Sequence, residues 1–419
     1  MNSAGHRIKV VFLTFYFEAW DALADVHSLM LADDRFEVTV VSIPRRFRAD
    51  EPFANEDKVS EFLSNAGVEH LRFNLDDSLD GLAKLRALAP DYVFINYPWQ
   101  RNYQPNYRVE KLAEFTKVAY VPYYSLALVN EPGEAGVTPY LYTQRSNQLA
   151  ALVFTQDPNT VAAYAKTGRG NGYVHLTGTP KIDALVRKVQ SGETNWPLPG
   201  GNRRMVWTPH HSFSEDWFNF GMFPEIAHDM LQFARSHQEL DIVLRPHPIM
   251  FGNLVASGMR TEAELASWLA DWNSLTNTAI DADGDIGALF AAADIFLTDG
   301  ISFIGEYPLA TGKPAVFFEK QNHWPWSPIG KIASRANIHV HNFVEFEEVF
   351  EDFLEHGLPD FSAEIAELRK AAQPFPGEAA EKIVEVILKD FELKTPLVNP
   401  ASVTDVAWEN RPGTEPSWD

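Results

Sequence analysis

The chain contains no cysteine. Disulfide bonds, cysteine-ligated zinc, iron–sulfur clusters and thiol nucleophiles are therefore excluded, so a nucleophile must be an oxygen or nitrogen or belong to the substrate. No apolar run approaches the ~20 residues that span a bilayer, and residues 1–7 lack the pattern of a secretory signal. We therefore expect a cytoplasmic protein.

Positive charge is scarce: 35 Lys and Arg stand against 57 Asp and Glu, which gives a formal net charge of −22 over 419 residues. Such a surface repels nucleic acid and anionic lipid, so nucleic acid is not an expected partner. The 45% hydrophobic and 22% charged residues are typical of a globular protein, and the length predicts about two to three domains.

Strand-like runs alternate with helical patterns in both halves of the chain. Strands are predicted at residues 8–14, 37–43, 92–96, 117–121, 152–155 and 173–176, and then at 204–208, 241–244, 294–298, 315–318 and 338–340. Because alternating strands and helices favour parallel sheets covered on both faces, we expect an α/β protein with two Rossmann-like, doubly wound domains facing a cleft.

The Pro- and Gly-rich segment 191–201 is interpreted as the boundary between the two domains. This predicts an N-terminal domain at residues 1–195 and a C-terminal domain at 202–393. The remaining residues, 394–419, have no apolar periodicity and are predicted to form a flexible tail.

A tight turn, Thr298-Asp299-Gly300, separates a strand from a helix that begins at about Ser302. Backbone N–H groups and a hydroxyl at the positive end of a helix suit a phosphate. The alternative is structural: Ser302 caps its helix and Asp299 closes a local turn.

A second candidate site follows the strand at 241–244, where the sequence reads Arg245-Pro-His-Pro248. The prolines beside His247 fix the loop, and ligands of open α/β sheets sit at the carboxyl ends of the strands. Arg245 and His247 together match a pyrophosphate. The alternative is a surface histidine beside an ion-paired arginine.

A third candidate site is Val206-Trp-Thr-Pro-His-His-Ser212, also at a strand end. Adjacent histidines are expected to point in different directions, so at most one faces a ligand. The helical spacing of histidine metal ligands is missing, so we expect His210 to contact phosphate or solvent, and we expect no metal and no cofactor.

These motifs resemble the CDP-glycerol glycerophosphotransferases that build teichoic-acid and capsule polymers, which are enzymes of the GT-B type. The resemblance rests mainly on Arg245-Pro-His-Pro248 followed by Thr298-Asp-Gly-Ile-Ser302 with Glu306. It is extended by the segments Gly178-Thr-Pro-Lys-Ile-Asp183, Gly377-Glu-Ala-Ala-Glu-Lys-Ile383, Asn96-Tyr-Pro-Trp-Gln100 and Tyr103-Gln-Pro-Asn-Tyr107.

The resemblance implies that His247, Thr298 and Ser302 meet the donor phosphates, and that Glu306 holds a ribose hydroxyl. The family's Trp-His-Gly-Thr-Pro segment, whose histidine is its presumed base, corresponds here to Val121-Pro-Tyr-Tyr-Ser125. Because that segment has no histidine, the candidates for the base are His27, Tyr123, Tyr124 and Glu131.

We therefore expect a transferase that moves glycerol phosphate, or a related phospho-alditol, from a CDP-activated donor to an acceptor hydroxyl in cell-surface polymer synthesis. The first domain would hold a glycan or lipid-linked acceptor, on the polar-aromatic stretch 97–107, with peripheral membrane contact left open. Two alternatives stay open: a GT-B glycosyltransferase that uses a CMP- or UDP-sugar, and a catalytically silent homologue that binds nucleotide or glycan.

Overall fold

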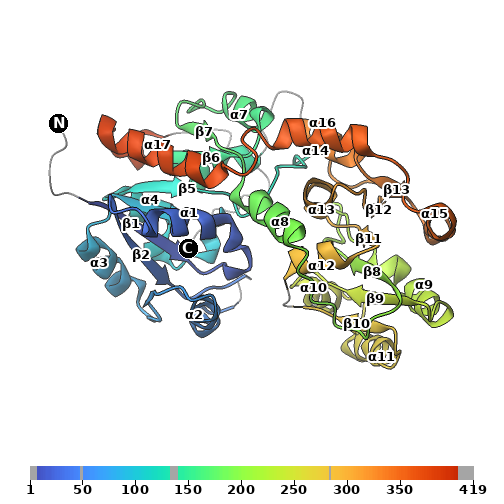
Figure 1. The fold of residues 1–419 in the computed structure, drawn as a ribbon. Coiled ribbons are helices and arrows are strands. Elements are labelled where there is room, and N and C mark those ends of the chain that lie inside the picture. The colour runs from blue at the N-terminus through green and yellow to red at the C-terminus, as the bar shows by residue number, and fades with distance from the viewer. Residues whose placement is uncertain (1–6, 48–50, 133–139, 283–284, 404–419) are drawn as a thin grey trace. The chain divides into compact units, whose positions relative to one another are not determined.

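The computed structural model describes residues 7–47, 51–132, 140–282 and 285–403. The strands form two parallel sheets, one of seven strands and one of six, and helices lie on both faces of each (Figure 1). The chain divides into two compact units: residues 1–125, 133–183 and 373–419 form the first, and residues 126–132 and 184–372 form the second. The predicted α/β class with two doubly wound sheets is confirmed.

The sheet of the first unit has the order β3-β2-β1-β4-β5-β6-β7. Its strands are β1 (Ile8–Thr14), β2 (Phe36–Ser42), β3 (Leu71–Arg72), β4 (Tyr92–Ile95), β5 (Lys117–Tyr120), β6 (Leu152–Thr155) and β7 (Val174–Leu176). The helices between them are α1 (Asp21–Leu31), α2 (Glu56–Asn65), α3 (Ser78–Leu88), α4 (Val109–Ala113), α5 (Tyr140–Thr143), α6 (Arg145–Leu149) and α7 (Pro158–Tyr164), and α8 (Pro180–Ser191) leads into the second unit.

The sheet of the second unit has the order β10-β9-β8-β11-β12-β13. Its strands are β8 (Arg203–Thr208), β9 (Leu240–Leu244), β10 (Thr278–Ile280), β11 (Ile295–Thr298), β12 (Val316–Phe318) and β13 (Ile338–Val340). The helices are α9 (Phe223–Ser236), α10 (Met250–Ala256), α11 (Glu262–Asn273), α12 (Ile286–Ala292), α13 (Phe303–Thr311), α14 (Pro328–Arg335), α15 (Phe343–His356) and α16 (Ser362–Ala372).

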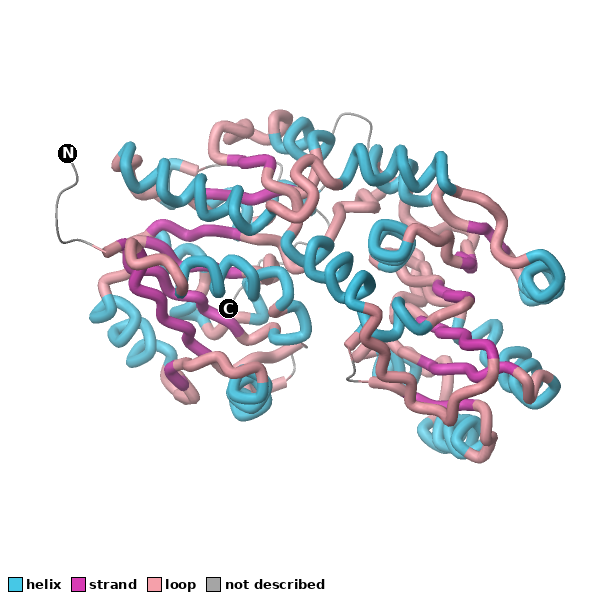
Figure 2. The backbone as a smooth tube through the Cα atoms, in the orientation of Figure 1, coloured by secondary structure: helices cyan, strands magenta, loops and turns pink. Residues whose placement is uncertain are grey.

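The strands are continuous apolar runs because helices cover both faces of each sheet (Figure 2). In β8, Met205 and Trp207 belong to the large core cluster on one face, while the intervening Val206 is equally buried on the other. The Trp207 ring stacks on Phe223 of α9 at 5.5 Å between centroids. These aromatic contacts fix α9 against the sheet and so fix the loop that precedes it.

The boundary of the first unit differs from the predicted one, because the last helix, α17 (Ala379–Leu393), packs on α1 rather than on the second sheet. Its N-terminus is held by Asp183, whose carboxylate accepts the backbone N–H groups of Gly377 (2.9 Å) and Ala379 (3.0 Å). The Gly178–Asp183 and Gly377–Ile383 motifs therefore bind each other, and residues 373–393 belong to the first unit rather than to the predicted domain 202–393.

The start of the predicted tail also packs on the first unit. The Lys117 ammonium pairs with Asp390 at 2.5 Å and donates to Thr395 Oγ1 at 2.7 Å. Tyr92 donates a further hydrogen bond to Asp390. The prediction of a flexible tail from residue 394 is therefore wrong at Thr395, which is held by hydrogen bonds. The predicted tail residues 404–419 lie outside the described part of the chain.

Each sheet has one point where the strand order reverses, which is where open α/β sheets bind ligands. In the first unit it lies between β1 and β4, and in the second between β8 and β11. The second of these points is flanked by the predicted His210 and Thr298–Ser302 segments. None of the helices in the described ranges is both long and apolar enough to cross a membrane.

Candidate functional site

The loops after β8 and β9 run side by side in the second unit, because the strand pairing continues past the strand ends. The backbone N–H of Arg245 donates to the Trp207 carbonyl at 2.8 Å, and the N–H of His247 donates to the Pro209 carbonyl at 3.2 Å. Two segments about 35 residues apart in sequence thus place their histidines together at the carboxyl edge of the sheet.

Three imidazole rings meet at this edge. The ring centroids of His210 and His211 are 4.4 Å apart with nearly parallel planes, those of His211 and His247 are 4.1 Å apart, and those of His210 and His247 are 5.6 Å apart. The expectation that the adjacent histidines diverge is therefore wrong: both join one cluster with His247. We call His210, His211 and His247 the histidine cluster.

Local donors fix which nitrogen of each ring carries the proton. His210 Nδ1 lies 2.8 Å from the Ser212 hydroxyl and accepts the backbone N–H of Ser212 at 3.3 Å, and His247 Nδ1 accepts the backbone N–H of Ile249 at 3.4 Å. The amide nitrogen of Asn253 lies 3.4 Å from His211 Nδ1. Because each Nδ1 accepts, each neutral ring carries its proton on Nε2. No Nε2 atom of the cluster has a hydrogen-bond partner in the described part of the chain, so three N–H donors are available to a ligand.

The cluster is uncharged at neutral pH. Burial, together with the neighbouring histidines, holds the pKa of His210 and of His247 well below the usual 6.5. Burial lowers the pKa of His211 to about 4. No group of three or more metal-ligating side chains suited to a metal ion occurs among the described residues. Because its neutral rings present N–H donors, the cluster is suited to hydrogen bonding with an anion.

Asp299, directly after β11, braces the loop that carries two of these histidines. Its carboxylate accepts the backbone N–H of His210 and that of Met222, each at 2.5 Å, and the side chain is 1% exposed. Burial raises the pKa of Asp299 to about 7, although both hydrogen bonds favour the ionised form. Asp299 therefore positions residues 210–222 and does not close a turn within its own segment.

The predicted phosphate turn is present, but its two hydroxyls differ. Thr298 Oγ1 is fully buried, donates to the Thr208 carbonyl at 3.2 Å and accepts the N–H of Gly300 at 2.8 Å. Thr298 thus builds the turn rather than offering its hydroxyl to a ligand. Ser302 is exposed at the start of α13 and makes no capping hydrogen bond with its side chain. The alternative prediction, that the Ser302 side chain caps its helix, is therefore wrong. The Ser302 hydroxyl lies at the N-terminal, positive end of α13.

Arg245 is turned toward the neighbouring strand β10. Its guanidinium pairs with the Asp281 carboxylate at 3.0 Å and donates to the Asp281 carbonyl at 3.2 Å. Arg245 thus forms an ion pair, as the structural alternative to a pyrophosphate contact predicts. Its positive charge is compensated by Asp281, so a catalytic role for Arg245 rests on the sequence motif alone.

Glu306 lies one turn into α13 and is 1% exposed. Its helix contains Pro308, which cannot donate to the Ile304 carbonyl, and Asn337 donates to that carbonyl instead at 2.8 Å. The helix therefore continues through the proline with Glu306 inside the packed layer. A contact between Glu306 and a ribose hydroxyl stays a prediction.

Three of the four candidates for a base, His27, Tyr123 and Tyr124, lie in the first unit and are unsuited to that role. His27 packs in the core with its ring 5.5 Å from Phe12, and burial lowers its pKa. Burial raises the pKa of Tyr123 and of Tyr124, so both phenols stay protonated at neutral pH. Glu131, the one carboxylate among the four candidates, lies in segment 126–132 of the second unit, and its role as the base stays a prediction.

The predicted aromatic stretch divides into core and edge residues. Tyr103 and Tyr107 are 1% and 0% exposed and belong to the core of the first unit. Tyr97 is half-buried, and its ring lies 4.7 Å from Tyr16 and 5.3 Å from Tyr123, at the carboxyl ends of β1, β4 and β5. This edge group fits the expected contact with a glycan.

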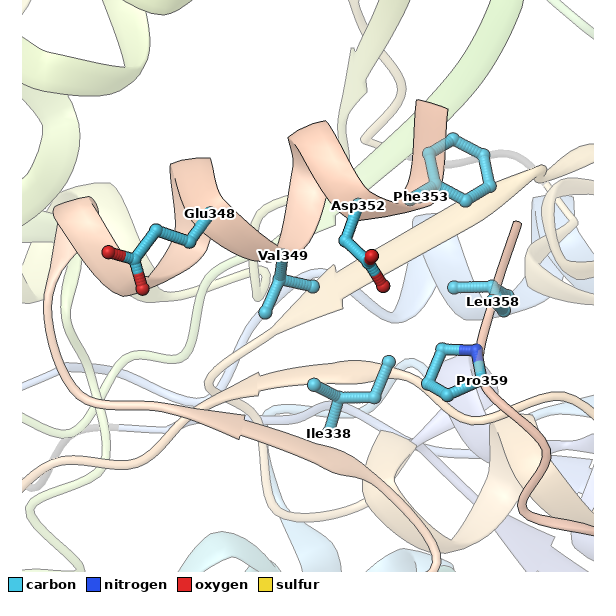
Figure 3. Close-up of a pocket in the computed structure, with 7 residues that line it drawn as sticks. All are labelled: Ile338, Glu348, Val349, Asp352, Phe353, Leu358 and Pro359. Atoms are coloured by element: carbon cyan, nitrogen blue, oxygen red, sulfur yellow. The ribbon is translucent and has the colours of Figure 1, made fainter. Parts of the chain in front are cut away.

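A separate pocket lies between β13 and α15, at the edge of the second sheet (Figure 3). Its lining is mostly apolar, with two carboxylates at its rim: Ile338, Glu348, Val349, Asp352, Phe353, Leu358 and Pro359. None of the predicted site residues lines this pocket.

No protein-family model and no curated protein sequence matches the chain. Solved structures with a similar fold include the UDP-GlcNAc 2-epimerase from Neisseria meningitidis bound to UDP-GlcNAc, with 14% identity and a TM-score of 0.58 over 92% of this chain and 100% of that chain. The UDP-GlcNAc 2-epimerase from Methanocaldococcus jannaschii in complex with UDP-GlcNAc and UDP has 12% identity and a TM-score of 0.57, over 92% and 100% of the chains.

The wall teichoic acid polymerase TagF has 13% identity and a TM-score of 0.58, over 93% of this chain and 90% of that chain. At these identities the similarity establishes the fold alone. The chain has the GT-B fold, as its sequence motifs predict, and that fold occurs here in proteins of two different activities.

Proposed function

We propose that the second unit binds the diphosphate of a nucleotide-activated donor at the histidine cluster, and that the protein transfers the activated group to an acceptor hydroxyl. One observation carries this proposal: three imidazoles converge at the strand-order reversal, each with its Nδ1 held and its Nε2–H free to donate. Ser302 adds a hydroxyl at the start of α13 on the far side of the same point.

Glycerol phosphate from CDP-glycerol is the group that the sequence motifs favour. In that reaction the acceptor oxygen attacks the phosphorus that carries the glycerol, the bond from this phosphorus to the bridging oxygen breaks, and CMP leaves. The negative charge that develops on the departing phosphate is the charge that Nε2–H donors stabilise. The similarity to TagF is compatible with this reaction.

The proton of the acceptor hydroxyl goes to a base outside the histidine cluster. Each Nδ1 of the cluster is occupied by a local donor and each Nε2 already carries its proton, so the neutral rings donate rather than accept. A carboxylate such as Glu131 is the expected acceptor of the proton.

Chemistry on a UDP-sugar is the second candidate, because two of the similar structures contain UDP-GlcNAc. The diphosphate site serves both candidates, and they differ in which bond breaks: phosphorus to oxygen in the first, and the sugar carbon to oxygen in a glycosyl transfer.

Incubation with CDP-glycerol, CMP-sugars and UDP-sugars, followed by chromatography of the released nucleotide, tests these candidates. CMP release from CDP-glycerol supports the first, and UDP release from a UDP-sugar supports the second, whereas CMP release from a CMP-sugar would argue against a site built for a diphosphate. Binding without release under every acceptor supports a catalytically silent homologue. Absence of both binding and release would refute the proposed donor site.

A further inference from the structure

A group of aromatic rings forms a surface on two loops of the second unit, one after β8 and one after β12. The ring of Phe218 lies 4.6 Å from Trp217 and 4.7 Å from Trp324, and the two indoles are 5.6 Å apart. We call Trp217, Phe218 and Trp324 the aromatic platform. It belongs to neither the donor site described above nor the sheet core.

Hydrogen bonds lock the two loops into one body. The Trp324 backbone N–H donates to the Phe218 carbonyl at 3.0 Å, and the Trp324 indole N–H donates to the Glu215 carbonyl at 3.1 Å. The buried Asn219 side chain donates to the Asn322 carbonyl at 3.2 Å. The rings are therefore held in place before any ligand arrives, which reduces the entropy lost on binding.

The backbone is strained at the centre of the platform. Phe218 and Asn219 have φ angles of 60° and 55°, in the left-handed region that a bulky residue such as phenylalanine rarely adopts. Such conformations persist where the surroundings impose them, and they concentrate at functional sites. Trp217, directly before these two residues, is 37% exposed.

Carboxylates border the platform. Glu215 and Asp216 directly precede Trp217 and are exposed, and the Asn322 amide donates to Glu215 at 3.3 Å. The nearby Lys320 is paired with Glu225 at 2.8 Å. The rim thus offers mainly acceptor oxygens and negative charge.

We propose that the aromatic platform binds a neutral saccharide. The apolar C–H face of a pyranose ring packs flat on an indole, and the sugar hydroxyls donate to the carboxylates of Glu215 and Asp216. A phosphate polymer is repelled by the same carboxylates. A quaternary ammonium ion requires rings that surround it, whereas these three rings pack against one another at 4.6–5.6 Å and leave no cage.

The platform also adjoins the histidine cluster, since the Phe218 and His210 ring centroids are 6.5 Å apart. A saccharide on the platform therefore lies beside the proposed diphosphate site. The binding itself does not depend on the proposed donor, and the identification of the saccharide as the acceptor rests on the proposed function.

Isothermal titration and saturation-transfer NMR with neutral disaccharides of glucose, galactose and N-acetylglucosamine test the proposal on the full chain. Glycerol phosphate oligomers and choline serve as the charged probes. We expect at least one disaccharide to bind. Trp217→Ala should weaken this binding by about tenfold, because an exposed part of an indole face is lost, while Trp217→Phe should retain most of it.

Met259→Ala is the matched control, because Met259 is also 37% exposed and lies in the same unit. This variant should bind the disaccharide as the wild type does, and thermal unfolding should confirm that each variant is folded. CDP-glycerol affinity should be unchanged in Trp217→Ala, which separates failure of the platform from failure of the donor site. The proposal is overturned if no disaccharide binds, if Trp217→Ala binds as well as the control, or if only a charged probe binds.

Discussion

Replacing His247 probes the donor site most sharply, because its ring takes part in the cluster while its loop contributes little to the core. In the wild type the Ile249 N–H points to Nδ1 at 3.4 Å, which leaves Nε2–H as the donor. A hydrogen bond to a charged acceptor contributes about 1.5–3 kcal/mol. His247→Ala should therefore weaken binding of CDP-glycerol, or of the nucleotide sugar that proves to be the donor, by about 10- to 150-fold.

Turnover should fall further than binding, by about 10²–10³-fold, because the charge on the leaving phosphate grows in the transition state. His247→Gln keeps an N–H donor near the position of Nε2 and should fall between the wild type and alanine. Folding should change little, since His247 lies in a loop and is not part of the apolar core of the second unit.

Calorimetric titration and nucleotide release measure the two effects, and His228→Ala serves as the control because His228 is exposed on α9. If His247→Ala stays within about threefold of the wild type in both assays, far below the effect expected of such a donor, the reasoning about the cluster is refuted.

Three further predictions follow from the same contacts. In Asp299→Asn one of the two oxygens that accept the backbone N–H groups of His210 and Met222 is lost, so the free energy of unfolding should fall by about 1–3 kcal/mol and donor binding should weaken. Asp294→Asn is the control, because Asp294 is exposed and accepts the backbone N–H of Arg204 before β11, and this variant should bind the donor as the wild type does. Denaturant unfolding and calorimetric titration measure the two effects. Affinity for CDP-glycerol should change little between pH 7.5 and 6.5, because burial keeps the pKa of His210 and of His247 well below 6.5 and their Nδ1 atoms already accept N–H groups; a steep rise in affinity on acidification over this range would contradict a neutral cluster. Truncation after residue 403 should leave the melting temperature unchanged. Truncation after Lys394 should lower the melting temperature, because it removes the hydrogen bonds of Thr395 with Lys117 and Asp390. Equal melting temperatures for the two truncated proteins would show that these contacts do not stabilise the fold.

Much of the fold could be predicted because the strands are buried on both faces and so appear as apolar runs in the sequence. Strands β1, β6 and β13 have the predicted bounds. Strands β3 and β10 were not predicted. Strand β3 has two residues, both exposed, so it contains no apolar run. The partner of Arg245 was missed together with β10, since Asp281 directly follows that strand.

The return of α17 to the first unit could not be predicted from its amphipathic pattern. Such a pattern shows that one face of a helix is buried and does not show which sheet buries it. The contacts that decide this are the caps made by Asp183 and the buried pairing of Asp390 with Lys117, which join residues about 200 and 270 positions apart.

The candidate site was predicted in part. His210, His247 and Asp299 lie together at the edge of the second sheet, as their positions after strands imply. His211 was missed, because the meeting of its ring with His247 depends on the pairing of the two loops beyond their strands. The hydrogen bond of Thr298 Oγ1 to the Thr208 carbonyl could not be predicted either, since a hydroxyl in this position can bind the backbone or a ligand.

The central claim is that the three Nε2–H groups of the histidine cluster bind the donor diphosphate, and NMR of protein labelled with ¹⁵N-histidine tests it most directly. On titration with CDP-glycerol and, in parallel, with a UDP-sugar, at least one donor should shift the Nε2 signals of His210, His211 and His247. The apparent pKa of these histidines should rise from the low values that burial imposes, while the signals of exposed His228 should stay in place. Cluster signals that remain unchanged at saturating concentrations of a donor that binds elsewhere on the protein, or that is turned over by it, would contradict the claim.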